Sequence, residues 1–492
     1  MSDNQEPSSI ASSSNPAPPQ EQVADGSIKA AAPPPWAAAQ TDNGKDAKDQ
    51  SMSVGKARES IFKKLIPVLG LIILVAGGYF LVKKIILPYL QKEGSPISSS
   101  KKITLTYWGL WEPETVVASL IEEYQKKNPN VTIKYVHQSY KDYRERLQST
   151  LARGEEVDIF RFHQTWLPML IKDLAPVPQQ TGQNLNLDGN YFPVVGKSLK
   201  AEGSFYGIPL EYDGLALYYN TKIFKDAGKT PPTTWEELRR TALDLTVRDK
   251  QGKIQIAGAA LGTTNNVDHF SDILALMMLQ NGADLAKPEG ALAEDALKFY
   301  TIFVTSDKVW DEDLPSSTYA FANEKTAMYF GPSWRAHDIK NINPNLEFKT
   351  IPVPQLPETK VGWASFWAEG VAAKSKNIEE AFKFLEYLSE KESLIKLYSS
   401  ASQIRTFGEP YPKKDMVSEL EEDPIVGAFV KQGEYAQSWY LCSFTHDNGI
   451  NDKMIKYYQD AINEVLGHQN VTTALKTTAQ GVTQVLNQYG IK

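Results

Sequence analysis

The sequence predicts an α/β fold for the globular part of the chain, from about Lys102 onward. Strand-like and helix-like segments alternate there, with apolar or alternating runs at 103–108 (ITLTYW), 131–136 (VTIKYV) and 157–160 (VDIF). Pro113 suits the first turn of a helix running to Asn128, and Gly154 ends a second helix over 141–153. Strands that alternate with helices predict right-handed crossovers and a parallel sheet flanked by helices.

Composition narrows the class of protein. The 492 residues suffice for more than one domain. Residues 101–492 carry 42 basic and 50 acidic side chains, a net charge of −8, which argues against binding nucleic acid. Cys442 is the single cysteine, so no intramolecular disulfide can form. No zinc spacing, phosphate loop or dinucleotide fingerprint occurs, so we expect neither a metal nor a cofactor.

The first hundred residues divide into three segments. Residues 1–60 are rich in Ser, Pro, Ala and Gln, and we expect a disordered tail. Residues 61–90 contain an uncharged run, 65–82, whose ~27 Å helical length approaches the roughly 30 Å bilayer core. Lysine pairs bracket this run, so we predict a single transmembrane helix, with a buried core helix or a cleaved signal peptide as alternatives. Residues 91–101 are predicted to be a flexible linker.

The orientation of this anchor rests on flanking charge. Basic residues are slightly more frequent before the apolar run than after it, which places the tail in the cytoplasm and the globular part outside. No cysteine follows the run, so attachment of a lipid at a new N-terminal cysteine is excluded.

A polar segment precedes the strand predicted at Leu215–Tyr219. Glu211, Tyr212 and Asp213 come directly before Gly214 and this strand. Because buried carboxylates without partners are costly, the segment indicates a walled site that water can reach, with a solvated surface loop as the alternative. Other candidates follow the first and third strands, at the edge where ligands of parallel sheets bind: Trp108, Trp111, Arg161, His163, Gln164 and Trp166.

Several segments, in their order and spacing, resemble a known family. They are LTYWGLW, VDIF, FYGIPLEYDGLALYYNTKIF, PPTTWEEL, AMYFGPSW and WAEGVAAKSKNIEEAFKFLEYL. Together they resemble the extracellular solute-binding proteins of ABC importers, in the branch that includes maltose- and other sugar-binding proteins, over about residues 102–492. The predicted membrane anchor departs from the cleaved signal or lipidated cysteine that is usual in this family.

The resemblance implies the type II fold of periplasmic binding proteins, with two α/β lobes around a cleft. Lobe I is expected at 102–212 and 363–390, and lobe II at 213–362 and 391–492. The segment PLEYDG would be the first crossing between lobes, with Gly214 relieving its bend. Further ligand-binding candidates, each with a core or surface position as its alternative, are Trp334, Trp363, Trp367, Arg405 and Trp439.

Aromatic rings suit carbohydrate because a flat ring covers the apolar C–H face of a sugar, while carboxylates and Arg bond its hydroxyls. The sequence therefore predicts a tethered binding protein, not an enzyme, that closes over a small solute, most simply a sugar, and passes it to the permease subunits of an ABC transporter. A glycoside hydrolase using Glu211 and Asp213, about 7 Å apart in an extended chain, is the alternative.

Local signals complete the prediction. Thr234 and Glu237 are predicted to form a capping box, and residues 249–253 (DKQGK) are predicted to form a hairpin turn. The C-terminal stretch from Asp452 to Tyr489 has helical spacing and is predicted to pack against lobe II.

Overall fold

The computed structural model describes residues 102–491. The predicted tail 1–60, membrane anchor 61–90 and linker 91–101 lie outside the described residues. Within 102–491, no helix combines the length and the apolar character needed to cross a membrane.

The first sheet is the parallel layer that the sequence predicts. Strand β1 (Ile103–Gly109) pairs in parallel with β2 (Val131–His137) and β3 (Ile159–His163), and β12 (Trp367–Val371) adds an antiparallel edge. Helices α3 (Glu114–Lys127) and α4 (Tyr143–Arg153) are the crossovers, and Gly154 ends α4 with φ 71°. The predicted third strand begins and ends later than expected, so Arg161 and His163 lie inside β3 rather than beyond it.

Several short elements, and two helices that follow β12 in the chain, surround this sheet. Helix α14 packs on β12, α3 and α6, and α15 packs on α3. The elements are η2 (Gln164–Trp166), α5 (Leu167–Leu170), α6 (Gln179–Leu185), α7 (Pro193–Leu199), β4 (Lys200–Ala201), β5 (Ser204–Phe205), α14 (Ile378–Leu388) and α15 (Lys391–Ala401).

The second sheet is mixed and has the order β10-β6-β9-β8-β7. The capping box of Thr234 and Glu237 and the 249–253 turn between β7 and β8 are confirmed. The strands are β6 (Ala216–Asn220), β7 (Val247–Arg248), β8 (Ile254–Ala259), β9 (Thr326–Gly331) and β10 (Phe348–Ile351). The remaining elements here are α8 (Thr221–Asp226), α9 (Trp235–Leu245), α10 (Phe270–Gln280), α11 (Ala291–Thr305), α12 (Ser317–Ala322), α13 (Arg335–Ile342), η3 (Lys414–Glu419), α16 (Gly427–Gln432) and η4 (Gly433–Tyr435).

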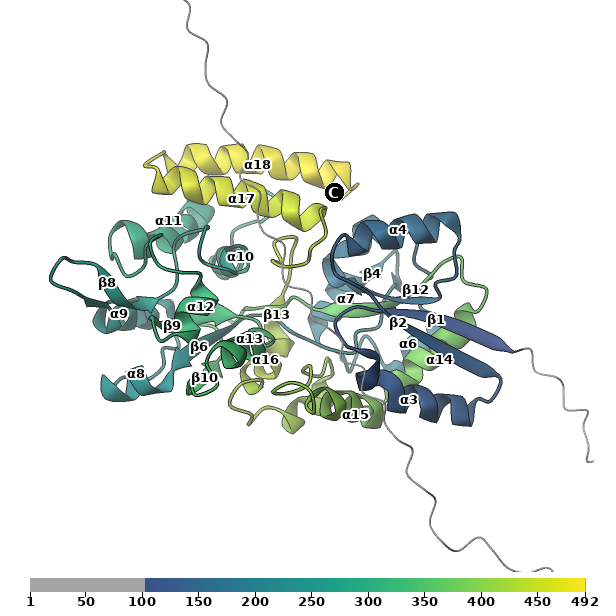
Figure 1. Cartoon of the computed structure of the whole chain (residues 1–492). Coiled ribbons are helices and arrows are strands. Elements are labelled where there is room, and N and C mark those ends of the chain that lie inside the picture. Colours follow the sequence, from purple (N-terminus) through teal and green to yellow (C-terminus); the bar gives the residue numbers. More distant parts are fainter. Residues whose placement is uncertain (1–101, 492) are drawn as a thin grey trace, which may run out of the picture. The chain divides into compact units, whose positions relative to one another are not determined.

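The C-terminal helical stretch consists of two helices. Helices α17 (Ile450–Leu466) and α18 (Val471–Gln488) lie side by side, and both pack on α11 (Figure 1). Gly467 ends α17, and the side chain of Asn470 caps α18 by accepting a hydrogen bond from the Thr473 amide. The helix pair covers the core of the second sheet.

Three chain segments run side by side between the two sheets. Gly214 bridges to Ala364, and β11 (Gly362–Trp363) pairs in parallel with β13 (Ala436–Gln437). The Ser365 amide donates to the Asp213 carbonyl at 2.9 Å, and the Ala364 amide donates to the Gln437 carbonyl at 2.8 Å. The polar segment that opens β6 is therefore one of three adjoining crossings.

Two hydrophobic cores fill the described residues. One joins the first sheet to the face of the second sheet that carries Tyr218 and Tyr329. The other lies under α9, α10, α11, α17 and α18. Residues of α15 and α16, such as Leu394 and Phe429, belong to the first core, so it is shared by segments that the sequence assigned to different lobes. The lobe boundaries stay predictions.

Candidate functional site

Asp213 fastens the first crossing to the end of β9. Its carboxylate accepts hydrogen bonds from the amides of Gly214 and Ser333 (2.7 and 3.0 Å) and from the Ser333 hydroxyl (2.9 Å). Burial, and secondly the Glu409 carboxylate, raise the pKa of Asp213 to about 8, although these hydrogen bonds act in the opposite direction. Asp213 thus positions the loop that carries Trp334 instead of facing open solvent.

Glu211 belongs to a buried charge cluster, which we define as Glu112, Arg161, Glu211, Glu369, Arg405 and Glu409. Arg161 lies at its centre: Nε donates to Glu369 (2.7 Å), and Nη1 contacts Glu112 and lies 3.5 Å from Glu211. Arg405 pairs with Glu409 at 2.8 Å. Burial raises the pKa of Glu211, and Arg161 opposes this. The predicted ligand contacts of Glu211 and Arg405 are therefore occupied by protein partners in this structure.

The charge cluster could also bind a cation. Carboxylate oxygens of Glu112, Glu211 and Glu409 all lie within 4.8 Å of one another. Arg161 and Arg405 already bring positive charge to these carboxylates, so the arrangement is stabilised without a metal.

Two predicted ligand contacts lie in the cores. Tyr212 is 1% exposed, and its ring centroid lies 4.7 Å from that of Phe192. Trp363 is also 1% exposed, and its indole N–H donates to Asp272 at 2.8 Å. Gly214, which was expected to relieve a bend in the crossing, does not have a left-handed backbone. It is required because a Cβ there would lie 1.9 Å from the Trp363 carbonyl oxygen.

Four other predicted aromatic residues join three further rings in a continuous series, which we call the aromatic row. Successive ring centroids are 4.9–6.3 Å apart along it. Its members, in spatial order, are Trp166, Trp367, Trp111, Tyr140, His446, Phe444 and Trp334. Trp367 lies in β12 of the first sheet, Trp111 lies in the loop that follows β1 of the same sheet, and Trp334 comes from the turn after β9 of the second. The row therefore spans both sheets.

The middle of the aromatic row is open to solvent. Trp111, Tyr140 and Phe444 are 36%, 52% and 39% exposed, whereas Trp166 is 1% exposed. A fourth exposed aromatic residue of the described region, Tyr319, lines a cavity of about 480 Å³ together with Phe444 and Arg335. Exposed apolar surface gathered in one place marks an interaction site more often than scattered residues do.

Arg335 is held against the end of the row. Its guanidinium lies 4.3 Å from the ring centre of Trp334 and 4.4 Å from that of Phe444. Nε donates to His269 Nε2 at 3.0 Å, and Nη1 contacts Asp338 at 2.9 Å. The row thus ends in a fixed cation beside the 480 Å³ cavity.

A buried polar network supports the other end. His163 contacts Thr165 Oγ1 through Nδ1 (2.7 Å) and Ser365 Oγ through Nε2 (3.1 Å), and its ring packs on Trp367. Burial lowers the pKa of His163 to about 3, so the imidazole is neutral. Gln164 donates to Ser438 Oγ at 2.6 Å, which joins β3 to the third crossing.

The remaining candidates lie at the edges of this arrangement. Trp108 is half-buried in β1, 6.5 Å from Tyr143. Trp439 is half-buried against Tyr440 and Tyr458 in the second core. Neither has a ring contact with the aromatic row.

Sequence reasoning missed Tyr140, Phe444 and His446. All three lie in loops, where side chains follow no periodic pattern. One usable signal was the sequence SFTHDNG, because aromatic residues in a polar segment just before a helix have no core to fill.

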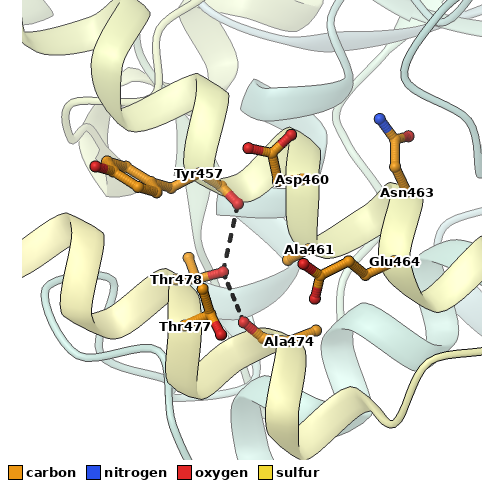
Figure 2. Close-up of a pocket in the computed structure, with 8 residues that line it drawn as sticks. All are labelled: Tyr457, Asp460, Ala461, Asn463, Glu464, Ala474, Thr477 and Thr478. Atoms are coloured by element: carbon orange, nitrogen blue, oxygen red, sulfur yellow. Dashed lines mark hydrogen bonds between the residues drawn. The ribbon is translucent and has the colours of Figure 1, made fainter.

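A second cavity, of about 400 Å³, lies between α17 and α18 (Figure 2). Thr478 spans its floor by donating to the carbonyls of Tyr457 (3.3 Å) and Ala474 (3.0 Å). None of the residues predicted from the sequence lines it, and its walls come from these two helices alone. It therefore does not combine groups from both sheets as the aromatic row does.

The hydrolase alternative does not fit these contacts. Glycoside hydrolysis needs two carboxyl groups facing one sugar across a cleft. Glu211 points into the charge cluster and Asp213 toward Ser333, so the pair does not face a common space.

The described geometry agrees with similarities to known proteins. Residues 119–424 match the family model of the bacterial extracellular solute-binding proteins. A multiple sugar-binding protein of Streptococcus mutans is 23% identical over 64% of this chain and 77% of its own length. A maltotriose-binding protein of Pyrococcus abyssi is 23% identical over 73% of this chain and 77% of its own.

Solved structures share the fold. The sugar-binding protein MalE of Xanthomonas citri has a TM-score of 0.64 at 20% identity and covers 78% of this chain and 98% of its own. A cyclo/maltodextrin-binding protein complexed with maltotetraose has a TM-score of 0.64 at 17% identity. The match covers 78% of this chain and 97% of that protein. The chain belongs to the bacterial extracellular solute-binding proteins, a family of binding proteins of ABC importers and not of enzymes.

Proposed function

We propose that this chain captures a carbohydrate on its aromatic row and delivers it to an ABC permease. The observation that carries the proposal is the row itself, a continuous series of rings that runs from Trp367 in the first sheet to Trp334 beside the second and is open to solvent in its middle. A sugar would lay its apolar C–H face on Trp111, Tyr140 or Trp334. Similar proteins named for multiple sugars, maltotriose and maltooligosaccharides support this class of ligand.

Polar groups beside the row would bond the hydroxyl rim. Arg335 is half-buried next to the 480 Å³ cavity, whose lining also includes Asp268 and Asp338. Ligand sites combine apolar walls with a few fixed polar groups, as here. Trp367 and Trp166 would form the buried end of the site.

The three adjoining crossings would act as the hinge. They link lobes proposed at 102–212 with 363–390 and at 213–362 with 391–492. Hinge closure brings groups from two lobes onto one ligand, and contacts made only in the closed form favour closure. Asp213 and Ser333 would keep the crossing and the Trp334 turn together during this motion, because their hydrogen bonds lie within one side of the hinge.

The apolar run within 61–90 would hold the protein at the membrane, with the tail 1–60 in the cytoplasm and the binding region outside. Some similar proteins are solute-binding lipoproteins, which are also held at a membrane. Anchoring raises the local concentration of a binding protein near its permease. The closed, loaded form would dock there.

Intrinsic tryptophan fluorescence of the full chain, titrated with maltose, maltotriose, maltotetraose, tagatose and mannobiose, tests the proposal. The detergent must lack a sugar headgroup, because alkyl maltosides would compete for the site. We expect at least one sugar to change the emission saturably and to raise the melting temperature, since a ligand that binds the folded state stabilises it. No response to any sugar would contradict the proposal.

A further inference from the structure

The loop Ser443–Gly449, which we call the strap, joins the third crossing to α17 and alternates buried and exposed residues. Thr445 and Asp447 are 2% and 0% exposed, whereas Phe444, His446 and Asn448 are exposed. The loop thus has an anchored side and a projecting side.

The projecting residues all have a left-handed backbone. The φ angles of Phe444, His446 and Asn448 are 58°, 54° and 43°. Such angles are uncommon for residues other than glycine. Asn and His adopt them more often than most residues do, so the bulky ring of Phe444 is the true outlier of the three. Strain of this kind persists only where the surroundings enforce it, and it is concentrated at ligand-binding and active sites.

The buried residues of the strap hold its backbone in this conformation. They attach the strap to α10 beside the second sheet and to α4 beside the first. The Ser443 amide donates to Asp272 of α10 (3.2 Å), and its hydroxyl contacts His269 Nδ1 (2.8 Å). The Asp447 carboxylate accepts from the amides of Gly449 (2.9 Å) and Asn451 (3.0 Å). The Asp447 carbonyl accepts from Arg144 Nε of α4.

The two projecting rings connect the middle of the aromatic row to its Trp334 end. Phe444 lies 5.9 Å from Trp334, and His446 lies 4.9 Å from Tyr140. Within residues 102–491 the His446 imidazole makes no hydrogen bond that meets ordinary geometry, so its nitrogens are free for a ligand. An apolar ring and an unused hydrogen-bonding ring are therefore held out at adjoining positions by a backbone that glycine would adopt more easily.

We infer that Phe444 and His446 determine which sugar the site accepts; this rests on the proposed function. Phe444 offers a face for one sugar ring, and His446 a hydrogen bond to a hydroxyl of that ring or the next. The strained strap holds both rings in place before the ligand arrives, which lowers the entropy lost on binding.

Paired substitutions separate the ring from the backbone strain. Phe444→Ala and Phe444→Gly both remove the ring, but only glycine relaxes the left-handed angle. With the sugar of the panel above that binds best, we expect Kd to rise at least tenfold in both, and the melting temperature to be higher for Phe444→Gly. Phe444→Tyr should restore Kd to within threefold, and His446→Ala should change the ranking of the sugars.

Matched controls make the result decisive. Asn448→Gly relaxes the same strap without removing a ring, and Tyr457→Ala removes a half-buried ring of α17 away from the row; both should keep Kd within threefold. Phe444→Gly and His446→Ala with unchanged Kd values and an unchanged sugar ranking would overturn the inference and leave the proposed function standing. Failure of the unchanged protein to bind any sugar would overturn both.

Discussion

Strands β3 and β12 contribute to both the aromatic row and the charge cluster, at residue pairs only two positions apart along the strands. His163 pairs with Trp367, and Arg161 pairs with Glu369 in the same ladder. At the first pair an indole faces other rings and partial solvent. At the second, roughly 7 Å along the strand, a guanidinium and a carboxylate are buried and bonded to each other. The same face of this strand pair thus carries a proposed ligand-binding residue at the end of the strands and a buried ion pair two residues further into the sheet.

The difference lies in what covers each pair. The charge cluster is closed by the crossing at Glu211 and by the loop that carries Arg405 and Glu409, so its charges must satisfy one another. The aromatic row includes the two projecting rings of the strap, and its middle stays open to solvent. The polar residues that the sequence singled out therefore belong to the buried charge cluster. The region that is open to solvent is marked instead by the exposed rings of the aromatic row.

Among these predictions, removing Arg161, the cation at the centre of the charge cluster, should have the largest effect, and this effect is on stability. Arg161→Met leaves Glu211 and Glu369 buried without the cation they contact, and leaves Glu112 with only the more distant Arg405 (3.9 Å). We expect the free energy of unfolding to fall by about 3–5 kcal/mol. Urea unfolding followed by circular dichroism measures it. Arg153→Met, which breaks the exposed Glu155 pair, should leave the midpoint unchanged. Equal midpoints for both variants would show that the cluster contributes no net stability.

A buried tryptophan should affect stability and not binding. Trp363→Phe removes the donor to Asp272 and leaves a partly unfilled space, which should cost about 1–3 kcal/mol. Calorimetric titration of the folded variant should give the Kd of the unchanged protein. A Kd raised tenfold at unchanged stability would place Trp363 in the binding site after all.

Stability should fall with rising pH because of Asp213. Its pKa is about 8 in the folded state and near 4 in the unfolded chain, so between these values the folded state binds more protons. The free energy of unfolding therefore decreases as pH rises through this window, by at most about 1.4 kcal/mol per pH unit. Asp213→Asn should flatten the melting-temperature profile between pH 5 and 8, and an equally steep profile in that variant would refute the assignment.

Neutralising Glu211 should have the smallest effect on function. Glu211→Gln keeps the shape of the side chain and removes one negative charge from a cluster with four carboxylates and two guanidiniums. We expect the Kd for sugar to stay within about threefold, since the side chain is 7% exposed and faces Arg161. If Glu211→Gln lost sugar binding, the ligand would have to contact the charge cluster instead of the aromatic row.

Local patterns predicted the elements better than the site. The parallel order of β1, β2 and β3 and the Thr234 cap follow from signals a few residues long. The segment at Glu211–Asp213 was predicted to line a site that water can reach, whereas the structure buries both carboxylates. Their partners Arg161 and Ser333 are distant in sequence, so sequence alone could not show that they occupy these carboxylates. Tyr140, Phe444 and His446 were missed because loop positions follow from tertiary anchors.

The central claim is that rings from both sheets hold one ligand. Isothermal titration of the full chain, Trp111→Ala and Trp334→Ala with the best-binding sugar tests it most directly. The account predicts that each single substitution raises Kd at least tenfold while the melting temperature stays within a few degrees. A variant that binds as tightly as the unchanged protein, with the other impaired, would confine the ligand to one sheet and contradict the account.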